Sequence, residues 1–372
     1  MGSNHARKLL NGDVPGLELT AVADINPEQL KAFPDLASYA DAESLIADGK
    51  VDAVLIATPH YSHTTLGIAA LEGGLHVLVE KPISVHKADC EKLIAAYRPD
   101  SGQVFAAMFN QRTDPRYQKL RKLIQDGTLG SIQRINWIIT SWFRTENYYA
   151  SGDWRATWAG EGGGVLLNQC PHQLDLWQWL FGMPQKVTAF CQYGRFHDIE
   201  VEDSVTAVME YDNGIQGVFI TTTGEAPGTN RLEVVGDNGT IIIDAGDDLH
   251  FCKTEVPVSE FSRTSPGRFA RPEVWQVEIP ASSKGEQHRG IMKNFAAAIL
   301  EGEPLIAQAT EGIHSVELGN SMLWSTICGG TVELPLDSAA FEAALKEKIA
   351  SSTHVKQTVE ATPAEDMGTS FN

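Results

Sequence analysis

Two segments of the chain carry side chains suited to moving a proton. The segment VEKP places Glu80 and Lys81 at the end of an apolar run, and a lysine there is able to hydrogen-bond a hydroxyl and stabilise negative charge as its proton leaves. The segment GGGVLLNQCPHQLD carries Asn168, His172 and Asp175. A histidine, with a pKa of about 6.5 in water, is a natural acceptor for that proton at neutral pH. Together the segments predict acid–base chemistry at a hydroxyl group, with Lys81 and His172 as the chemical residues.

Each segment also has a purely structural interpretation. A Glu–Lys pair at a strand end often belongs to a solvated turn. His172, at a helix start, would in this interpretation hydrogen-bond Asp175 for a structural reason alone. For chemistry, Asn168 and His172, about one helical turn apart, would face the same cleft, and Asp175 would orient the imidazole. The neighbouring Cys170 suggests a Cys–His nucleophile, but the two residues are close in sequence and no third group accompanies them. We therefore do not expect a cysteine nucleophile.

An acidic residue ends the first apolar run of the chain. The run LELTAVAD closes on Asp24, at the position where the carboxylate of a dinucleotide-binding unit accepts hydrogen bonds from adenosine ribose hydroxyls. The same charge would repel a 2′-phosphate, so Asp24 favours NAD over NADP. The structural alternative is an aspartate that caps the helix following it.

The next apolar run ends in ATPHYSH, which brings further polar groups to the same edge. Thr58 and Pro59 close the strand, and we expect them, with His60 and His63, at the edge of a bound cofactor and at the N-terminus of the following helix. The two histidines also suggest a metal pair that would need a distant carboxylate. Nothing in the sequence requires a metal, and none is predicted.

Strands and helices alternate from Leu17 to Asn110. The predicted strands are 17–24, 51–59, 76–82 and 103–110, and the predicted helices are 26–33, 63–74 and 88–99. The strands read as near-continuous apolar runs, as strands buried on both faces do, and the helices begin and end with residues such as Pro27 and Gly73. Short links between alternating strands and helices predict a parallel sheet in an α/β domain.

The pattern changes after Asn110. Longer strands with alternating hydrophobicity follow, several joined by Asn-Gly turns of hairpin type, and they predict a mostly antiparallel sheet. Two late helical segments, 288–302 and 310–330, are expected to pack on that sheet. We therefore predict a dinucleotide-binding domain over 1–110, an α/β domain over 111–338, and a C-terminal helix with a mobile tail over 339–372.

Composition and charge exclude several classes of protein. The 372-residue chain has a formal net charge of -19 and no cluster of lysines or arginines, so we expect neither nucleic acid nor a membrane as a partner. Its tryptophans are expected in the core. Five scattered cysteines without a C-x-x-C pair argue against a disulfide framework and fit a reducing cytoplasm. No apolar run reaches the roughly 20 residues that cross a bilayer, and the N-terminus lacks the apolar core of a signal peptide.

The order of these segments is more specific than any one of them. A strand ending in Asp24 is followed by ATPHYSH, EKP, FNQR, GGGVLLNQCPHQLD and EGEP. This order resembles the Gfo/Idh/MocA oxidoreductases, the glucose-fructose oxidoreductase and inositol dehydrogenase family, over nearly the whole chain. The resemblance implies an N-terminal Rossmann domain with bound NAD and a C-terminal α/β domain whose open sheet serves substrate binding and oligomer contacts, in a homodimer or homotetramer. It also implies that Lys81 and His172 act together at a substrate hydroxyl, while Glu80 and Asn110 help to place Lys81 and the nicotinamide ribose.

The chain departs from the family pattern at two places. The family motif usually has an aspartate one turn before the histidine, whereas this chain has the uncharged Asn168, so substrate class or reaction direction is expected to differ from that of inositol dehydrogenases. A family member also opens with a strand and a G-x-G-x-x-G turn, whereas this chain begins MGSNHARKLL, with Gly2 in the third glycine's place. Those glycines and the helix N-terminus normally hold the pyrophosphate. The sequence therefore predicts either a longer natural N-terminus or a variant that does not bind the cofactor.

Three functions follow from these observations. The favoured one is reversible hydride transfer between NAD and a secondary hydroxyl of a sugar, sugar derivative or cyclitol. A glycoside-cleaving enzyme that recycles bound NAD is an alternative, because the lost aspartate and a tryptophan-rich cleft, which Trp154 and Arg155 are expected to reach, leave room for it. The third is a sugar- or nucleotide-sensing protein without catalysis, which the absent first strand favours and the retained Lys81 and His172 disfavour.

Overall fold

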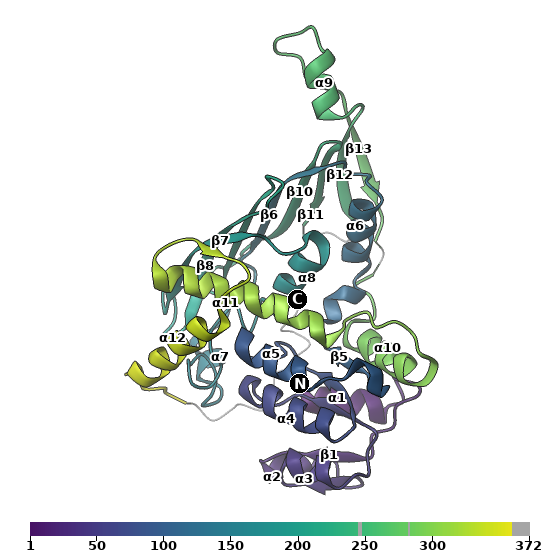
Figure 1. Ribbon diagram of the computed structural model, residues 1–372, viewed down its shortest axis with the longest axis vertical. Coiled ribbons are helices and arrows are strands. Elements are labelled where there is room, and N and C mark those ends of the chain that lie inside the picture. The colour runs from purple at the N-terminus through teal and green to yellow at the C-terminus, as the bar shows by residue number, and fades with distance from the viewer. Residues whose placement is uncertain (245–247, 282, 359–372) are drawn as a thin grey trace.

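The computed structural model describes residues 1–244, 248–281 and 283–358, and its N-terminal region alternates short strands with helices (Figure 1). The elements are α1 (Gly2–Leu10), β1 (Ala21–Ala23), α2 (Pro27–Leu30), β2 (Ala37–Tyr39), α3 (Ala42–Ala47), β3 (Ala53–Ile56), α4 (His60–Glu72), β4 (His76–Val79), α5 (Lys87–Ala96) and β5 (Phe105–Ala107). All strand pairs here are parallel: β1 pairs with β2, and β3, β4 and β5 form a second sheet. The predicted parallel Rossmann-type architecture is confirmed.

A gap divides the parallel strands of this domain. Within the described residues β1 pairs only with β2, and β3 pairs only with β4, so each has one edge without a strand partner. A cavity of about 720 Å³ is lined by both strands and by residues of α1 and of α10 (Gln287–Glu301). The order β2-β1-gap-β3-β4-β5 is that of a dinucleotide-binding sheet without its first strand. The opening residues of the chain predict this gap.

The second region is built on one open sheet of nine strands. Their order is β13-β12-β11-β10-β6-β9-β8-β7-β14, and only the β6–β9 pair is parallel among the described strands of this sheet. The strands are β6 (Ile132–Ile139), β7 (Lys186–Tyr193), β8 (Glu202–Glu210), β9 (Gln216–Thr222), β10 (Asn230–Gly236), β11 (Gly239–Ile243), β12 (Leu249–Thr254), β13 (Val274–Ile279) and β14 (Val332–Glu333). The helices are α6 (Pro115–Gln125), α7 (Glu146–Ala150), α8 (Pro171–Phe181), α9 (Val258–Thr264), α11 (Gly312–Cys328) and α12 (Ser338–Ser351). The mostly antiparallel open sheet is confirmed.

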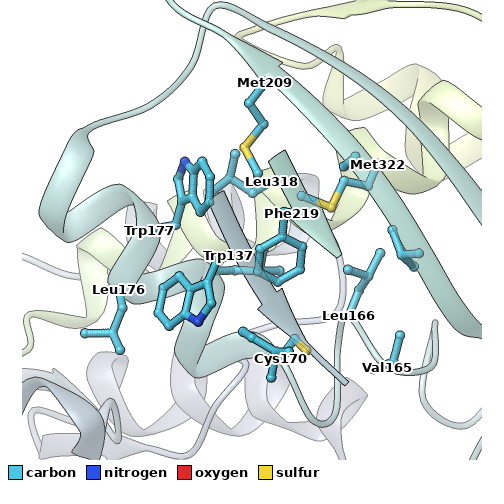
Figure 2. Close-up of a cluster of buried hydrophobic side chains, with 14 of the residues drawn as sticks. Trp137, Val165, Leu166, Cys170, Leu176, Trp177, Met209, Phe219, Leu318 and Met322 are labelled. Carbon is cyan, nitrogen blue, oxygen red and sulfur yellow. The ribbon is translucent and has the colours of Figure 1, made fainter. Parts of the chain in front are cut away.

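Helices α8 and α11 contribute, with the strands, to one large core (Figure 2). Trp177 of α8 meets Phe219 of β9 with ring centroids 6.0 Å apart, and its indole N–H donates to the Tyr211 hydroxyl at 2.8 Å. Trp137 of β6 is fully buried in the same core. These tryptophans are core residues, as the sequence predicts, and they hold α8 rigidly against the sheet.

Two contacts tie the regions together. Helix α10 lies within the predicted second domain but packs into the core of the first, where Ile291 and Phe295 are buried. The buried ammonium of Lys87 in α5 donates to a Glu317 carboxylate oxygen in α11 and to the main-chain oxygen of Leu336, both at 2.8 Å. These contacts fix the parallel-sheet region relative to α10 and α11.

The C-terminal helix predicted within 339–372 is α12, whereas the predicted mobile tail falls largely on 359–372, outside the described residues. In the described part of the chain, no helix combines the length and the apolar character needed to cross a membrane.

Candidate active site

Lys81 lies just after β4, at the carboxyl edge of the parallel strands, and reaches the second region. Its ammonium donates a 2.7 Å hydrogen bond to the main-chain oxygen of Asn168, in the loop before α8. Burial lowers the pKa of Lys81 from its ordinary value, and the carboxylates of Glu80 and Glu161 oppose this effect. The structure thus brings together two predicted site residues that are 87 positions apart in the chain.

His172 lies in the first turn of α8 and is 2% exposed. Neither of its ring nitrogens has a hydrogen-bond partner within the described structure. Burial, and next the positive charge of Lys81, hold the pKa of His172 well below its usual 6.5, so the imidazole is neutral at neutral pH. Buried polar groups nearly always have a partner, and a neutral imidazole without one is ready to accept a proton from a ligand.

The structure contradicts the prediction that Asp175 orients His172. Its two carboxylate oxygens accept from the guanidinium of Arg112, at 2.6 Å from Nη2 to Oδ1 and 2.8 Å from Nε to Oδ2. Gln178 donates to Oδ1 as well, at 3.1 Å. Arg112 also pairs with Glu311. Asp175 therefore serves as the counter-ion of a buried guanidinium that links α8 to the segment after β5.

Glu80 is bound from two sides. Its Oε1 lies 2.7 Å from Nε2 of His5 in α1, and its Oε2 accepts the main-chain N–H of Lys81 at 3.1 Å. Burial alone raises the pKa of Glu80, but the hydrogen bond and charge of His5 outweigh it and leave the pKa well below its usual 4.5. Glu80 is therefore ionised and fixes the main chain at Lys81.

Several residues expected at the cofactor line the cavity between the two parallel sheets. They are Gly2 at the start of α1, Asp24 after β1, and Thr58 with Pro59 after β3. Asp24 also has the local role that the sequence left open, because its Oδ1 accepts the N–H of Asn26 at 2.8 Å and Asn26 in turn caps α2. Its position supports both roles at once.

The residues present fit a dinucleotide. The Thr58 hydroxyl oxygen and the Asn110 amide oxygen are buried and have no partner within the described structure. Asn110 is held from its other side, since its amide nitrogen donates to Gln287 at 2.7 Å. These groups suit the ribose and nicotinamide, and the exposed N–H groups at the start of α1, beside Gly2, suit a phosphate.

His63 serves the scaffold instead of the cofactor. It is fully buried, with Nδ1 2.7 Å from the main-chain oxygen of Pro82 and Nε2 2.8 Å from that of Thr58. Because both nitrogens are engaged at the strand ends, neither is left for a cofactor or a metal, which corrects the prediction for His63. His60 is also buried, and its Nδ1 lies 3.4 Å from the main-chain oxygen of Glu161, in the second region.

Asn168 stands in a polar network whose other members, apart from Arg155, the sequence does not predict. Its amide nitrogen donates to Glu161, and its amide oxygen accepts from the Tyr148 hydroxyl at 3.2 Å. That hydroxyl accepts from Arg155 at 2.8 Å and from Gln169 at 3.0 Å. Of the missed residues, only Glu161 carries a signal in the sequence, an acidic residue directly before three glycines.

Cys170 is a core residue. Its Sγ lies 3.0 Å from the Thr221 hydroxyl, and burial raises the pKa of the thiol to about 12. A thiol with this pKa is inert at neutral pH, in agreement with the expectation that no cysteine nucleophile operates here.

A Rossmann domain whose strand ends place a lysine within electrostatic range of a buried histidine in the second region is the arrangement of a two-domain, NAD-type oxidoreductase. Comparison with known families agrees: residues 1–108 match "Oxidoreductase family, NAD-binding Rossmann fold" and residues 117–242 match "GFO/IDH/MocA C-terminal domain". The chain belongs to the Gfo/Idh/MocA oxidoreductase family.

Relatives with described activities are similar over most of the chain. The chain is 26% identical to levoglucosan dehydrogenase of Pseudarthrobacter phenanthrenivorans, covering 88% of this chain and 87% of that protein. It is 26% identical to myo-inositol 2-dehydrogenase of Thermotoga maritima, covering 86% and 91%. Other relatives match over less of their length: the alignment spans 55% of 1-carboxy-3-chloro-3,4-dihydroxycyclohexa-1,5-diene dehydrogenase of Comamonas testosteroni, at 32% identity and 59% of this chain.

Solved structures give the same result. The WlbA dehydrogenase from Chromobacterium violaceum, in complex with NADH and UDP-GlcNAcA, superposes with a TM-score of 0.76 at 26% identity, covering 90% of this chain and 93% of that one. The similarity supports an NAD-type cofactor for the family fold described here.

Proposed function

We propose that this protein transfers hydride between NAD and a secondary hydroxyl of a sugar, sugar derivative or cyclitol. The observation that carries this proposal is the neutral, buried His172, unpartnered at both nitrogens in the described structure and within electrostatic range of the Lys81 ammonium. The names of the sugar and inositol dehydrogenases to which the chain is similar support the substrate class.

The two residues have separate roles in the oxidative direction. His172 accepts the proton of the hydroxyl, because its imidazole is neutral and has a free nitrogen. Lys81 donates a hydrogen bond to the same oxygen and stabilises the negative charge that develops there. The main-chain oxygen of Asn168 accepts a hydrogen bond from this ammonium and orients it. When bound, the nicotinamide supplies the acceptor for the hydride.

We further propose NAD in preference to NADP. Asp24 lines the cavity after β1, where its carboxylate would accept from ribose hydroxyls and repel a 2′-phosphate. Gly2, Thr58, Pro59 and Asn110 complete the set of residues proposed to hold the dinucleotide.

Calorimetry with NADH and NADPH, followed by a spectrophotometric screen of sugars and cyclitols with NAD, tests the proposal. We expect NADH to bind more tightly and at least one polyol to reduce NAD. Cleavage of a glycoside without net NADH release would instead support the alternative function, a glycoside-cleaving enzyme that recycles bound NAD. Sugar binding without redox turnover at any pH would indicate a sensing protein.

We also propose a cytoplasmic homodimer or homotetramer that pairs through the open sheet. Phe190 on β7 is 69% exposed, on the opposite side of the strand from the residues packed on α11, and Trp275 on β13 is 50% exposed. Exposed aromatic residues on one sheet are typical of an interface. All five cysteines are free thiols, as suits a reducing compartment. Light scattering of the native protein and of Phe190→Glu tests the assembly; an unchanged mass would contradict it.

A further inference from the structure

The proposed site holds the partly buried ammonium of Lys81, and the residue that accepts its hydrogen bond, Asn168, has no charge. A buried cation is costly unless a counter-charge accompanies it. Asn168 offers Lys81 only a main-chain oxygen, at 2.7 Å. Glu80 supplies one negative charge from the Rossmann side, but its oxygens are engaged by His5 and by the main-chain N–H of Lys81. A second negative charge that acts on Lys81, Glu161, comes from the second region.

Glu161 lies on that side and is 1% exposed. One of its oxygens accepts from the Asn168 amide nitrogen, and the other accepts the N–H of Ala156 at 2.7 Å. Both oxygens thus accept hydrogen bonds, as the oxygens of an ionised carboxylate do. The two hydrogen bonds hold Glu161 directly behind the loop whose Asn168 oxygen binds Lys81.

The chain around Glu161 is bent to place it there. Ala156 has a φ of 55°, in the left-handed region that side chains other than glycine seldom adopt. A Cβ on Gly160 would come within 2.1 Å of the main-chain oxygen of Trp154, and one on Gly162 within 2.0 Å of the Val85 side chain. Strain and close approach of this kind concentrate at functional sites.

The charges facing Glu161 come from several elements. Arg155, Lys81 and Lys356 are cations that interact with it, and Glu202 is an acidic neighbour whose pKa burial raises to about 7. Burial raises the pKa of Glu161, while Arg155 and the hydrogen-bond donors oppose that rise. Lys81 in turn has its pKa raised by Glu161, against the effect of its own burial.

We propose that Glu161 is a positioning residue that supplies, one side chain away, the negative charge that Asn168 lacks. It holds the Asn168 loop against Lys81 and keeps the ammonium protonated, so that Lys81 remains a hydrogen-bond donor to the substrate hydroxyl. The expected loss of activity rests on the proposed function. The expected change in the pKa of Lys81 does not, and it can be measured without cofactor or substrate.

The direction of the effect is fixed by the signs of the charges. Removing the negative charge of Glu161 lowers the pKa of Lys81, so the ammonium loses its proton at a lower pH. The basic limb of the kcat/KM profile of Glu161→Gln therefore moves to lower pH, and kcat/KM on the plateau falls by about 10- to 100-fold, as expected when a reacting group is displaced.

A charge exchange separates this role from a structural one. In the double variant Glu161→Gln with Asn168→Asp, the hydrogen bond between residues 161 and 168 is kept while the charge moves to residue 168. We expect the double variant to recover the basic limb and most of the activity. The matched control is Glu200→Gln, since Glu200 accepts the N–H of Trp158 at 2.9 Å in the same loop and does not contact Asn168. The control is expected to keep the native pH profile.

A second readout needs neither cofactor nor substrate. The rate at which Lys81 reacts with an amine-specific reagent, followed against pH by mass spectrometry of the Lys81 peptide, reports its protonation. We expect half-reaction at lower pH in Glu161→Gln and recovery in the double variant, with circular dichroism showing that all variants fold. An unmoved Lys81 titration in a folded Glu161→Gln protein overturns the inference. Failure of the native protein to use any polyol, with the titration shifted as expected, overturns the proposed function alone.

Discussion

The Lys81 ammonium and the main-chain oxygen of Asn168 lie 2.7 Å apart, and their hydrogen bond joins the Rossmann strands to the loop before α8. We expect Lys81→Met to lower kcat/KM by about 10²- to 10³-fold, the usual loss when a donor to a developing charge is removed. Loss of this partly buried cation should leave the melting temperature unchanged or higher.

Lys87→Met is the control for this prediction, because Lys87 is a buried lysine at the start of α5 whose ammonium pairs with Glu317 of α11. It should lose stability while the folded fraction keeps its turnover. Equal turnover in Lys81→Met and the native protein would show that Lys81 does not act on substrate.

His172 sets the acid side of the pH dependence. Burial holds the pKa of His172 well below 6.5, so the neutral base persists as the pH falls through 6.5, and kcat/KM should decline only at lower pH. His172→Asn should lower kcat by about 10²- to 10⁴-fold. Kinetic profiles between pH 4.5 and 9, with His354→Asn as the control on an unrelated histidine, measure both effects. An acid limb centred at or above pH 6.5 contradicts the assignment.

The same shift has a consequence for stability. A depressed pKa in the folded state means that the unfolded chain binds more protons below pH 6.5, so the contribution of His172 to stability is complete above that pH and is lost as the pH falls toward the folded pKa. The pH dependence of the melting temperature in that range should be weaker in His172→Asn than in the native protein.

The sequence predicts the scaffold of the site better than its contacts. Lys81 and His172 stand at a strand end and a helix start, positions that apolar periodicity and turn residues reveal. The sequence does not reveal the partner of Asp175, because Arg112 is 63 positions away and only the packing of α8 brings the two together. Glu161 precedes three glycines, but residue types alone do not show that the loop, with Ala156 at a φ of 55°, turns its side chain inward.

Arg112 is expected to contribute to stability more than to chemistry. Its guanidinium and the Asp175 carboxylate are each 1% exposed, so removing one partner leaves the other charge buried and unpaired. We expect Arg112→Ala to lower the free energy of unfolding by about 3–5 kcal/mol. Urea denaturation measures this, with Arg134→Ala as control: the Arg134–Glu233 pair is partly exposed, and its loss should cost at most about 1 kcal/mol. A similar loss in both variants would argue against a buried-pair contribution.

Asp24 offers a direct test of cofactor choice. In the native protein the N–H of Asn26 donates to Oδ1 of Asp24 at 2.8 Å. Asp24→Asn keeps an oxygen that is able to accept this hydrogen bond but removes the charge proposed to repel a 2′-phosphate. We expect NADH to bind about 10- to 100-fold more weakly, since hydrogen bonds to a charged group are worth roughly 1.5–3 kcal/mol, and the preference over NADPH to shrink.

Asp41→Asn separates this effect from helix capping, because Asp41 caps α3 through the N–H of Ser44 at 2.7 Å. The control should leave both affinities unchanged in calorimetry. If Asp24→Asn retained the native ratio of NADH to NADPH affinity, the carboxylate would be a helix-start residue alone, and the cofactor preference would have to arise from other residues around the cavity between β1 and β3.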